Sequence, residues 1–209
     1  MLSEMYSGML LRISLVVFAL CSGMPALADK PDAATRLQAR LAPMSELSGR
    51  FEQSIYDDRG ELLQRSAGNF ALKRPNRLRW HTLEPYEHLV ITDGQELLRW
   101  DPDLEQLNRE PVSEEMMATP AMILGEGGDD LDQRYDIRAR RQAGEDHFTL
   151  SPRQESPFTA LTLRFDGERL SGIDMLDSLG QRTSIKLLDL NTRPALTAAD
   201  FALPAEAID

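Results

Sequence analysis

The hydrophobic pattern of residues 68–107 alternates in short runs that turn residues interrupt. In each run apolar side chains occupy every second position, which is the spacing of a strand with one apolar face. The alternating pairs are Phe70 and Leu72, Leu78 and Trp80, Leu89 and Ile91, and Leu98 and Trp100. The interruptions are residues 73–76, Glu84-Pro85, Asp93-Gly94 and residues 101–103. A period of two with turns of this chemistry predicts an antiparallel meander.

Strand signals of the same kind lie on both sides of this meander. Residues 47–56 alternate around Phe51 and Ile55, and residues 57–60 supply the turn into the next strand. Further strands are predicted at residues 135–140, 147–151, 161–165, 172–176 and 183–187. A sheet of about ten or eleven strands in one chain must curl. The predicted fold class is therefore mainly β, with one curled antiparallel sheet.

Helical patterns occur in only a few places. Residues 31–41 carry Ala34, Leu37 and Leu41 at helical spacing, and Pro43 ends this segment. Residues 112–126 form a second, broken helical segment interrupted by Pro120. Its apolar residues are Met116, Met117, Met122, Ile123 and Leu124. Residues 197–200 are predicted to form one further helical turn. The two apolar helical segments would cover the concave side of the sheet.

The first 28 residues have the pattern of a cleaved signal peptide. Arg12 supplies a positive charge, residues 13–21 an apolar run, and residues 26–28 an A-x-A cleavage site. Cleavage after Ala28 leaves residues 29–209 as a single domain. Cys21 follows Leu20 rather than a small residue, so we interpret it as part of the removed segment. We therefore predict an exported protein without a lipid anchor.

The net charge and the motifs of the sequence argue against several functional classes. The formal net charge of −11 disfavours nucleic acid and anionic lipid surfaces as partners. The motifs of serine hydrolases, zinc proteases and nucleotide-binding loops are missing from the sequence. His81, His88 and His147 lie on separate predicted strands without metal-ligand spacing. We therefore predict no enzymatic activity, no cofactor and no metal site.

Several ordered segments resemble the periplasmic outer-membrane lipoprotein carrier family of Gram-negative bacteria. The first block is Lys73-Arg74-Pro75-Asn76 followed by Leu78-Arg79-Trp80. The second block is Asp93-Gly94 followed by residues 100–106. Phe51-Glu52-Gln53 precedes these blocks and Gly180-Gln181-Arg182-Thr183 follows them. The resemblance extends over nearly all of residues 29–209.

This resemblance implies an incomplete antiparallel β-barrel with a helical lid over an apolar cavity. The function it implies is that of a monomeric periplasmic chaperone, which carries the acyl chains of lipoproteins. The implied partners are an inner-membrane lipoprotein-releasing ABC transporter and an outer-membrane lipoprotein receptor. Arg74 would hold the lid closed through hydrogen bonds. We expect Trp80, Trp100 and the Met-rich segment to share one face. The expected lining of the cavity is Phe51, Leu78, Trp80, Leu89, Ile91, Leu98, Trp100, Met116, Met117, Met122 and Ile123.

Other interpretations of these residues remain open. The same apolar residues would suit an ordinary core, and Met serves both as core filler and on adaptable ligand surfaces. A receptor of related fold would require an acylated cysteine at the mature N-terminus. A periplasmic lipid sensor that controls a signalling protein would be favoured by a second domain. Mass spectrometry of the mature protein would separate the carrier from the receptor.

Overall fold

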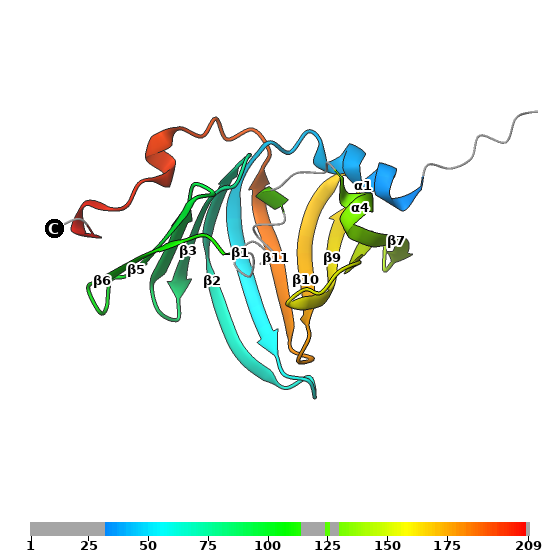
Figure 1. Cartoon of the computed structure of the whole chain (residues 1–209), viewed down its shortest axis with the longest axis horizontal. Helices are drawn as coiled ribbons and strands as arrows, with labels where there is room; N and C mark the ends of the chain where they lie inside the picture. Colours follow the sequence, from blue (N-terminus) through cyan, green and yellow to red (C-terminus); the bar gives the residue numbers. More distant parts are fainter. Residues whose placement is uncertain (1–31, 114–123, 126–129, 208–209) are drawn as a thin grey trace, which may run out of the picture. The chain divides into compact units, whose positions relative to one another are not determined.

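The protein folds around one antiparallel sheet of eleven strands. The structure, a computed structural model, describes residues 32–113, 124–125 and 130–207, all within one compact unit. The strand order is β6-β5-β4-β3-β2-β1-β11-β10-β9-β8-β7, so β6 and β7 are the two edges and the sheet is not closed into a barrel (Figure 1). This confirms the predicted mainly β, incomplete barrel.

The strands agree with the predicted ones to within a few residues at each end. They are β1 (Glu46–Tyr56), β2 (Leu62–Lys73), β3 (Arg77–Glu84), β4 (His88–Thr92), β5 (Glu96–Asp101), β6 (Gln106–Pro111), β7 (Tyr135–Gln142), β8 (Glu145–Pro152), β9 (Phe158–Asp166), β10 (Arg169–Asp177) and β11 (Arg182–Asn191). The helices are α1 (Ala33–Leu41), α4 (Leu131–Arg134), and the 3-10 turns η1 (Ala198–Phe201) and η2 (Ala205–Ala207).

Aspartates fix the geometry of three hairpin turns. Oδ1 of Asp57 accepts hydrogen bonds from the backbone N–H groups of Arg59 and Glu61, at 3.0 and 2.7 Å. Asp177 accepts in the same way from Leu179 and Gln181, both at 2.8 Å. Asp93 likewise accepts from two backbone N–H groups after it. These side chains replace backbone partners in the turn, so the predicted turn residues set where each hairpin reverses.

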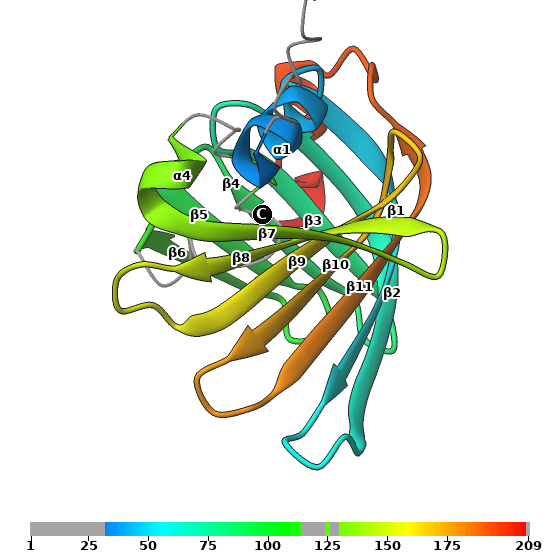
Figure 2. The same cartoon turned by 90° about the vertical axis from the view of Figure 1, so that its right-hand side faces the viewer.

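Helix α1 lies between the two flanks of the curved sheet (Figure 2). It begins at Asp32, whose Oδ1 accepts the backbone N–H of Thr35 at 2.7 Å and caps the helix. Leu37 and Leu41, the predicted apolar face, are buried in the main core. That core is built from the inner faces of strands on both flanks, together with Leu124 and Leu131. The helix therefore covers part of the concave side, as its pattern predicted.

The C-terminal segment lies on the outer face of the sheet and buries a second apolar cluster. The buried members of this cluster are Leu89, Ile91, Trp100 and Ala207, and Leu98, Leu107, Phe201 and Leu203 pack against them. Residues of β4 and β5 thus pack against η1 and η2. The one-turn helix predicted at residues 197–200 is present within one residue as η1, with Thr197 as its N-cap.

Two polar residues hold the start of this C-terminal segment. Nζ of Lys73 donates to the carbonyl oxygen of Leu196 at 2.7 Å and pairs with Oε1 of Glu46 at 2.7 Å. Oε2 of Glu46 accepts the backbone N–H of Leu196 at 2.9 Å. The Lys73 ammonium, followed by the Leu196 N–H, lowers the pKa of Glu46 below its ordinary value. The ionised carboxylate is therefore the form that ties the segment to β1 and β2.

The predicted Met-rich helical segment lies mostly outside the described residues. Met116, Met117, Met122 and Ile123 are among the residues that the structure does not describe, whereas Leu124 and Gly125 are helical and buried. No helix in the described part of the chain is long and apolar enough to cross a bilayer.

Candidate functional site

An aromatic cluster forms the centre of the inner face. The rings of Phe51 on β1 and Trp80 on β3 stack with centroids 3.9 Å apart and an interplanar angle of 25°. Phe70 on β2 lies beside them, 5.8 Å from Trp80. Gly68 lies on β2, between β1 and β3, and pairs with Phe51 of β1 and Thr82 of β3. A Cβ at Gly68 would overlap the carbonyl oxygen of His81, so glycine allows the close backbone approach beneath these rings.

Arg74 connects this face to two helical segments. It lies in the turn between β2 and β3, close to the buried Leu72 and Leu78. Its Nη1 donates to the carbonyl oxygen of Leu41 at 3.0 Å, and its Nε donates to that of Leu124 at 3.1 Å. Leu41 is the last residue of α1, where carbonyl groups lack a partner within the helix. One guanidinium therefore joins the end of α1 to the described end of the second helical segment.

Asn76 adds a backbone contact at the same turn. Its N–H donates to the carbonyl oxygen of Gly125 at 3.4 Å. The backbone N–H of Arg74 also donates to Ser45, in the connection between α1 and β1, at 2.9 Å. The motif that spans residues 73–76 is thus the place where sheet, α1 and residues 124–125 meet.

Four of the predicted lining residues lie on the other face of the sheet. Trp80 pairs with Val90, whereas Trp100 pairs with Leu89. Because Leu89 and Val90 are consecutive in β4, their side chains point to opposite faces. Leu89, Ile91, Leu98 and Trp100 accordingly form the outer cluster with the C-terminal segment. The prediction that Trp80 and Trp100 share a face is wrong, and these four residues do not belong to the inner face.

The structure places other residues on the inner face that the sequence analysis did not select. Val90, Thr92 and Leu97 pair on the same side as Leu78 and Trp80. The strands of the other flank add a larger apolar set, which includes Phe148, Leu150, Leu161, Leu163, Phe165, Ile173, Ile185 and Leu187. The alternation within residues 147–187 carries this signal, so the inner face extends well beyond the central meander.

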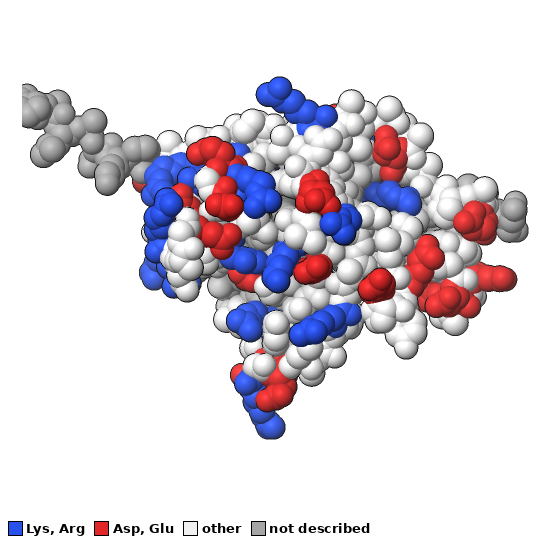
Figure 3. Space-filling view, turned by 180° about the vertical axis from the view of Figure 1, so that it is seen from behind, with Lys and Arg blue, Asp and Glu red and all other residues white. Residues whose placement is uncertain are grey.

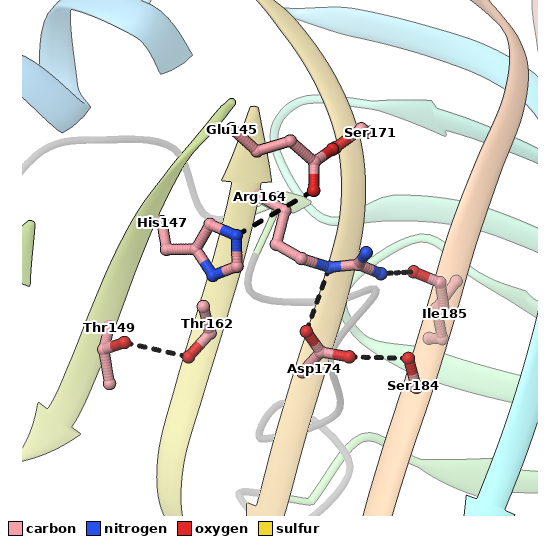
Figure 4. Close-up of polar contacts among 9 residues, drawn as sticks. All are labelled: Glu145, His147, Thr149, Thr162, Arg164, Ser171, Asp174, Ser184 and Ile185. Carbon is pink, nitrogen blue, oxygen red and sulfur yellow. Dashed lines mark hydrogen bonds and ion pairs between the residues drawn. The ribbon is translucent and has the colours of Figure 1, made fainter. Parts of the chain in front are cut away.

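The outer face of β8 to β11 carries a polar network instead (Figure 4). Nε of Arg164 lies 2.9 Å from Oδ2 of Asp174, and Nη2 of Arg164 donates to the carbonyl oxygen of Ile185 at 3.2 Å. The hydroxyl of Ser184 donates to the other oxygen of Asp174 at 2.6 Å. The hydroxyl of Ser171, also on β10, donates to Glu145 at the start of β8 at 2.6 Å. These strands therefore have a polar outer face and an apolar inner face, as is usual for an antiparallel sheet with one face in contact with solvent.

Charges are unevenly distributed over the surface. Figure 3 shows acidic side chains on the side of the molecule that carries β5 and β6, and many basic ones on the opposite side. The basic residues Arg138, Arg140 and Arg141 are exposed on the edge strand β7. Among residues 32–113, 124–125 and 130–207, no three His, Cys, Asp or Glu side chains converge in the manner of a metal site.

Comparison with known proteins assigns the family. A family model described as outer membrane lipoprotein carrier protein LolA matches residues 43–204. The chain belongs to the LolA family. An outer-membrane lipoprotein carrier protein of Chromohalobacter salexigens is 37% identical over 169 residues, which cover 80% of each chain. A carrier of the same description from Pseudomonas syringae is 34% identical over 193 residues, covering 92% of this chain and 93% of the relative.

Solved structures support the fold of this LolA family member. A LolA superfamily protein of Nitrosomonas europaea superposes with a TM-score of 0.51 at 14% identity, covering 83% of this chain and 99% of that chain. An uncharacterized conserved protein of Thermus thermophilus superposes with a TM-score of 0.54, also at 14% identity, covering 84% and 97%. At this level of identity the likeness concerns the fold alone.

Proposed function

We propose that the protein carries acylated lipoproteins through the periplasm and shields their acyl chains on the inner face of the sheet. The chain belongs to the LolA family, and one structural observation supports this function for it. The apolar inner face around Phe51 and Trp80 is bordered by two helical segments that a single arginine, Arg74, ties together. Such an arrangement can cover the empty apolar face when closed and expose it to cargo when the ties break.

The physical need for a carrier follows from the cost of moving acyl chains through water. Each buried methylene contributes about 0.8 kcal/mol, so two or three long chains hold a lipoprotein in the membrane. Non-covalent affinities end at roughly 20 kcal/mol, so full burial of all chains would prevent release. The Arg74 hydrogen bonds favour the closed, empty state. They therefore lower the net affinity for cargo and make delivery possible.

The proposal includes the route of the cargo. Residues 1–28 direct export and are removed near Ala28, which leaves a soluble periplasmic protein. An inner-membrane ABC transporter releases lipoproteins to the carrier, and an outer-membrane receptor accepts them. The role that we assign to Phe51, Leu78 and Trp80 is contact with acyl chains. Residues 116, 117, 122 and 123 keep the same assignment. Carriage of this kind breaks no bond and needs no cofactor.

Native mass spectrometry of protein purified from periplasm tests the proposal. We expect a fraction of the protein to retain one lipoprotein, and an acylated peptide to displace an apolar fluorescent probe from the empty protein. Replacement of Trp80 by serine should reduce both signals. A folded protein that retains no lipoprotein and binds neither probe nor acylated peptide would refute the carrier function.

A further inference from the structure

Part of β2 has a strand partner on one side only. β2 pairs with β1 from Lys73 to Leu62, but it pairs with β3 only from Lys73 to Ala67. Residues 62–66 therefore run past the end of β3, and Figures 1 and 2 both show the β1–β2 hairpin extending beyond the neighbouring strands. An unpaired strand edge presents backbone N–H and C=O groups that another strand can bind.

A pocket of about 870 Å³ lies beside the end of β3, where β2 continues without a partner on that side. Arg65, Ser66 and Ala67 of β2 line it on one side, and Glu84 and Pro85 at the end of β3 line it on another. Its remaining lining comes from β1 and β11 and includes Glu52, Gln53, Ser54, Tyr56, Ser184 and Lys186. The pocket therefore adjoins the unpaired edge and gives a bound segment room for side chains.

Exposed apolar side chains surround the same edge. Leu62 and Leu63 are 42% and 57% exposed, and Leu83 and Tyr86 at the end of β3 are 45% and 75% exposed. The remaining large exposed apolar residues of the described chain are Leu104, Leu176 and Leu179. All seven lie at this one end of the sheet, in four neighbouring hairpins. Clustering of this kind marks an interaction surface, whereas scattered single residues would not.

The charges next to the edge restrict what can bind there. The turns and strand ends at residues 57–61 and 84–88 contain the carboxylates of Asp57, Asp58, Glu61, Glu84 and Glu87 and a single arginine, Arg59. The edge and its pocket add Glu52, Arg65 and Lys186, so carboxylates still outnumber basic side chains there. A second copy of this chain would bring the same carboxylates against them, and anionic headgroups would be repelled as well. Lys or Arg side chains of a partner protein complement this surface.

We propose that residues 62–66 are a docking site for an extended segment of a partner protein, which adds to the sheet as a strand beside β2. Apolar side chains of that segment contact Leu63, Leu83 and Tyr86, and its Lys or Arg side chains face Glu84 and the carboxylates of the two turns. The inference rests on the proposed carrier function, in which the partners are the transporter that loads the carrier and the receptor that unloads it.

Binding of two purified probes tests this site: the periplasmic domain of the lipoprotein-releasing transporter, and the receptor without its acyl anchor. We expect the pair L63S and L83S, and separately E84K, to weaken binding of at least one probe by tenfold or more. In that complex the backbone amides of residues 62–66 should exchange hydrogen more slowly. The matched control is E168K, on the exposed β9–β10 turn and outside this apolar cluster; it should bind as the unchanged protein does.

Each contrary outcome has a distinct meaning. Unchanged affinity of L63S/L83S and E84K for a probe that binds the original chain would overturn the docking site alone. If neither probe bound the original chain, the docking site and the proposed partners would both fail. Vesicle binding or dimer formation that depends on Leu63 and Leu83 would overturn the choice of a protein partner. Lipoprotein retention by the same variants in native mass spectrometry reports separately on the carrier function.

Discussion

Trp80 and Trp100 lie on opposite faces of the same sheet. Trp80 stacks on Phe51 in the inner core, and Trp100 is 6% exposed in the outer cluster beneath the C-terminal segment. Each tryptophan belongs to an alternating apolar pair in the sequence, so the two look alike there. The register of their strands in the sheet is what puts the two rings on opposite faces. They therefore provide two reporters, one for the proposed cargo face and one for the outer face.

Single-tryptophan variants should distinguish the two faces. W100F leaves Trp80 and W80F leaves Trp100 as the only indole of the chain. An acylated peptide that carries a quencher on its acyl chain should quench fluorescence strongly in W100F and weakly in W80F, because only Trp80 faces the proposed cargo. Circular dichroism checks that both variants stay folded. Equal quenching in the two variants would contradict the assignment of the cargo to the inner face.

Replacement of Arg74 by leucine should trap cargo. The change removes hydrogen bonds to the carbonyl oxygens of Leu41 and Leu124, and bonds from a charged donor contribute about 1.5–3 kcal/mol each. Loss of even one bond favours the open, loaded state by tenfold or more, because about 1.4 kcal/mol is a factor of ten. We expect normal loading from membranes with the transporter and at least tenfold slower transfer to membranes with the receptor.

Arg77 provides the matched control for this experiment. It is an exposed arginine three residues further along the chain, at the start of β3. R77L removes the same charge but leaves the bonds to Leu41 and Leu124 in place, so loading and transfer should stay near the original rates. A loading defect in R74L with normal transfer of what is loaded would show that Arg74 acts in a different step.

Attachment of the C-terminal segment should depend on pH through Glu46. The folded state lowers the pKa of this carboxyl, chiefly through Lys73 and next through the N–H of Leu196. Its contribution to stability is therefore present above the ordinary pKa of 4.5 and is lost as the pH falls through the lowered value in the folded state. Hydrogen exchange of the Leu196 amide, corrected for its intrinsic pH dependence, should show protection near neutral pH that disappears in acid.

Two variants separate the effect of Glu46, on β1, from that of Asp200, a carboxyl on the C-terminal segment itself. Asp200 also has a lowered pKa, because it accepts the backbone N–H of Thr197 at the start of η1. E46Q should remove most of the pH dependence at Leu196 and reduce its protection at neutral pH, whereas D200N should act mainly on the amide of Thr197. Full pH-dependent protection of Leu196 in E46Q would contradict the assignment.

Alanine at Gly172 should destabilise the sheet. A Cβ there would overlap Nη2 of Arg164 and come within 2.6 Å of the carbonyl oxygen of Ile185. Overpacking of this kind costs about 1–3 kcal/mol, which lowers the Tm by roughly 2–4 °C per kcal/mol for a domain of this size. Thermal unfolding of G172A measures the effect. The double variant G172A/R164A should recover only part of it, since the Ile185 carbonyl remains; full recovery would show that the guanidinium alone causes the clash.

Local sequence patterns determined the strands, their turns and α1. The period-two runs and the Asp, Gly and Pro residues between them act over a few residues, so they need no knowledge of distant partners. The buried face of α1 followed in the same way from Leu37 and Leu41. The role assigned to Arg74 came from the resemblance of its motif to the LolA family and not from a local pattern, because the carbonyl groups that it binds lie 33 and 50 residues away.

Only the tertiary structure decided which apolar residues face the concave side. Alternation shows that Leu89 and Ile91 share a face, but it does not show which face, because an apolar strand residue can be buried on either side if something covers it. Here residues 198–207 cover the outer side and bury Leu89, Ile91 and Trp100 there. The pairing of β1 with β11 likewise joins strands more than a hundred residues apart and brings the two halves of the inner face together. Both results depend on contacts between distant segments, which a pattern of local periods does not contain.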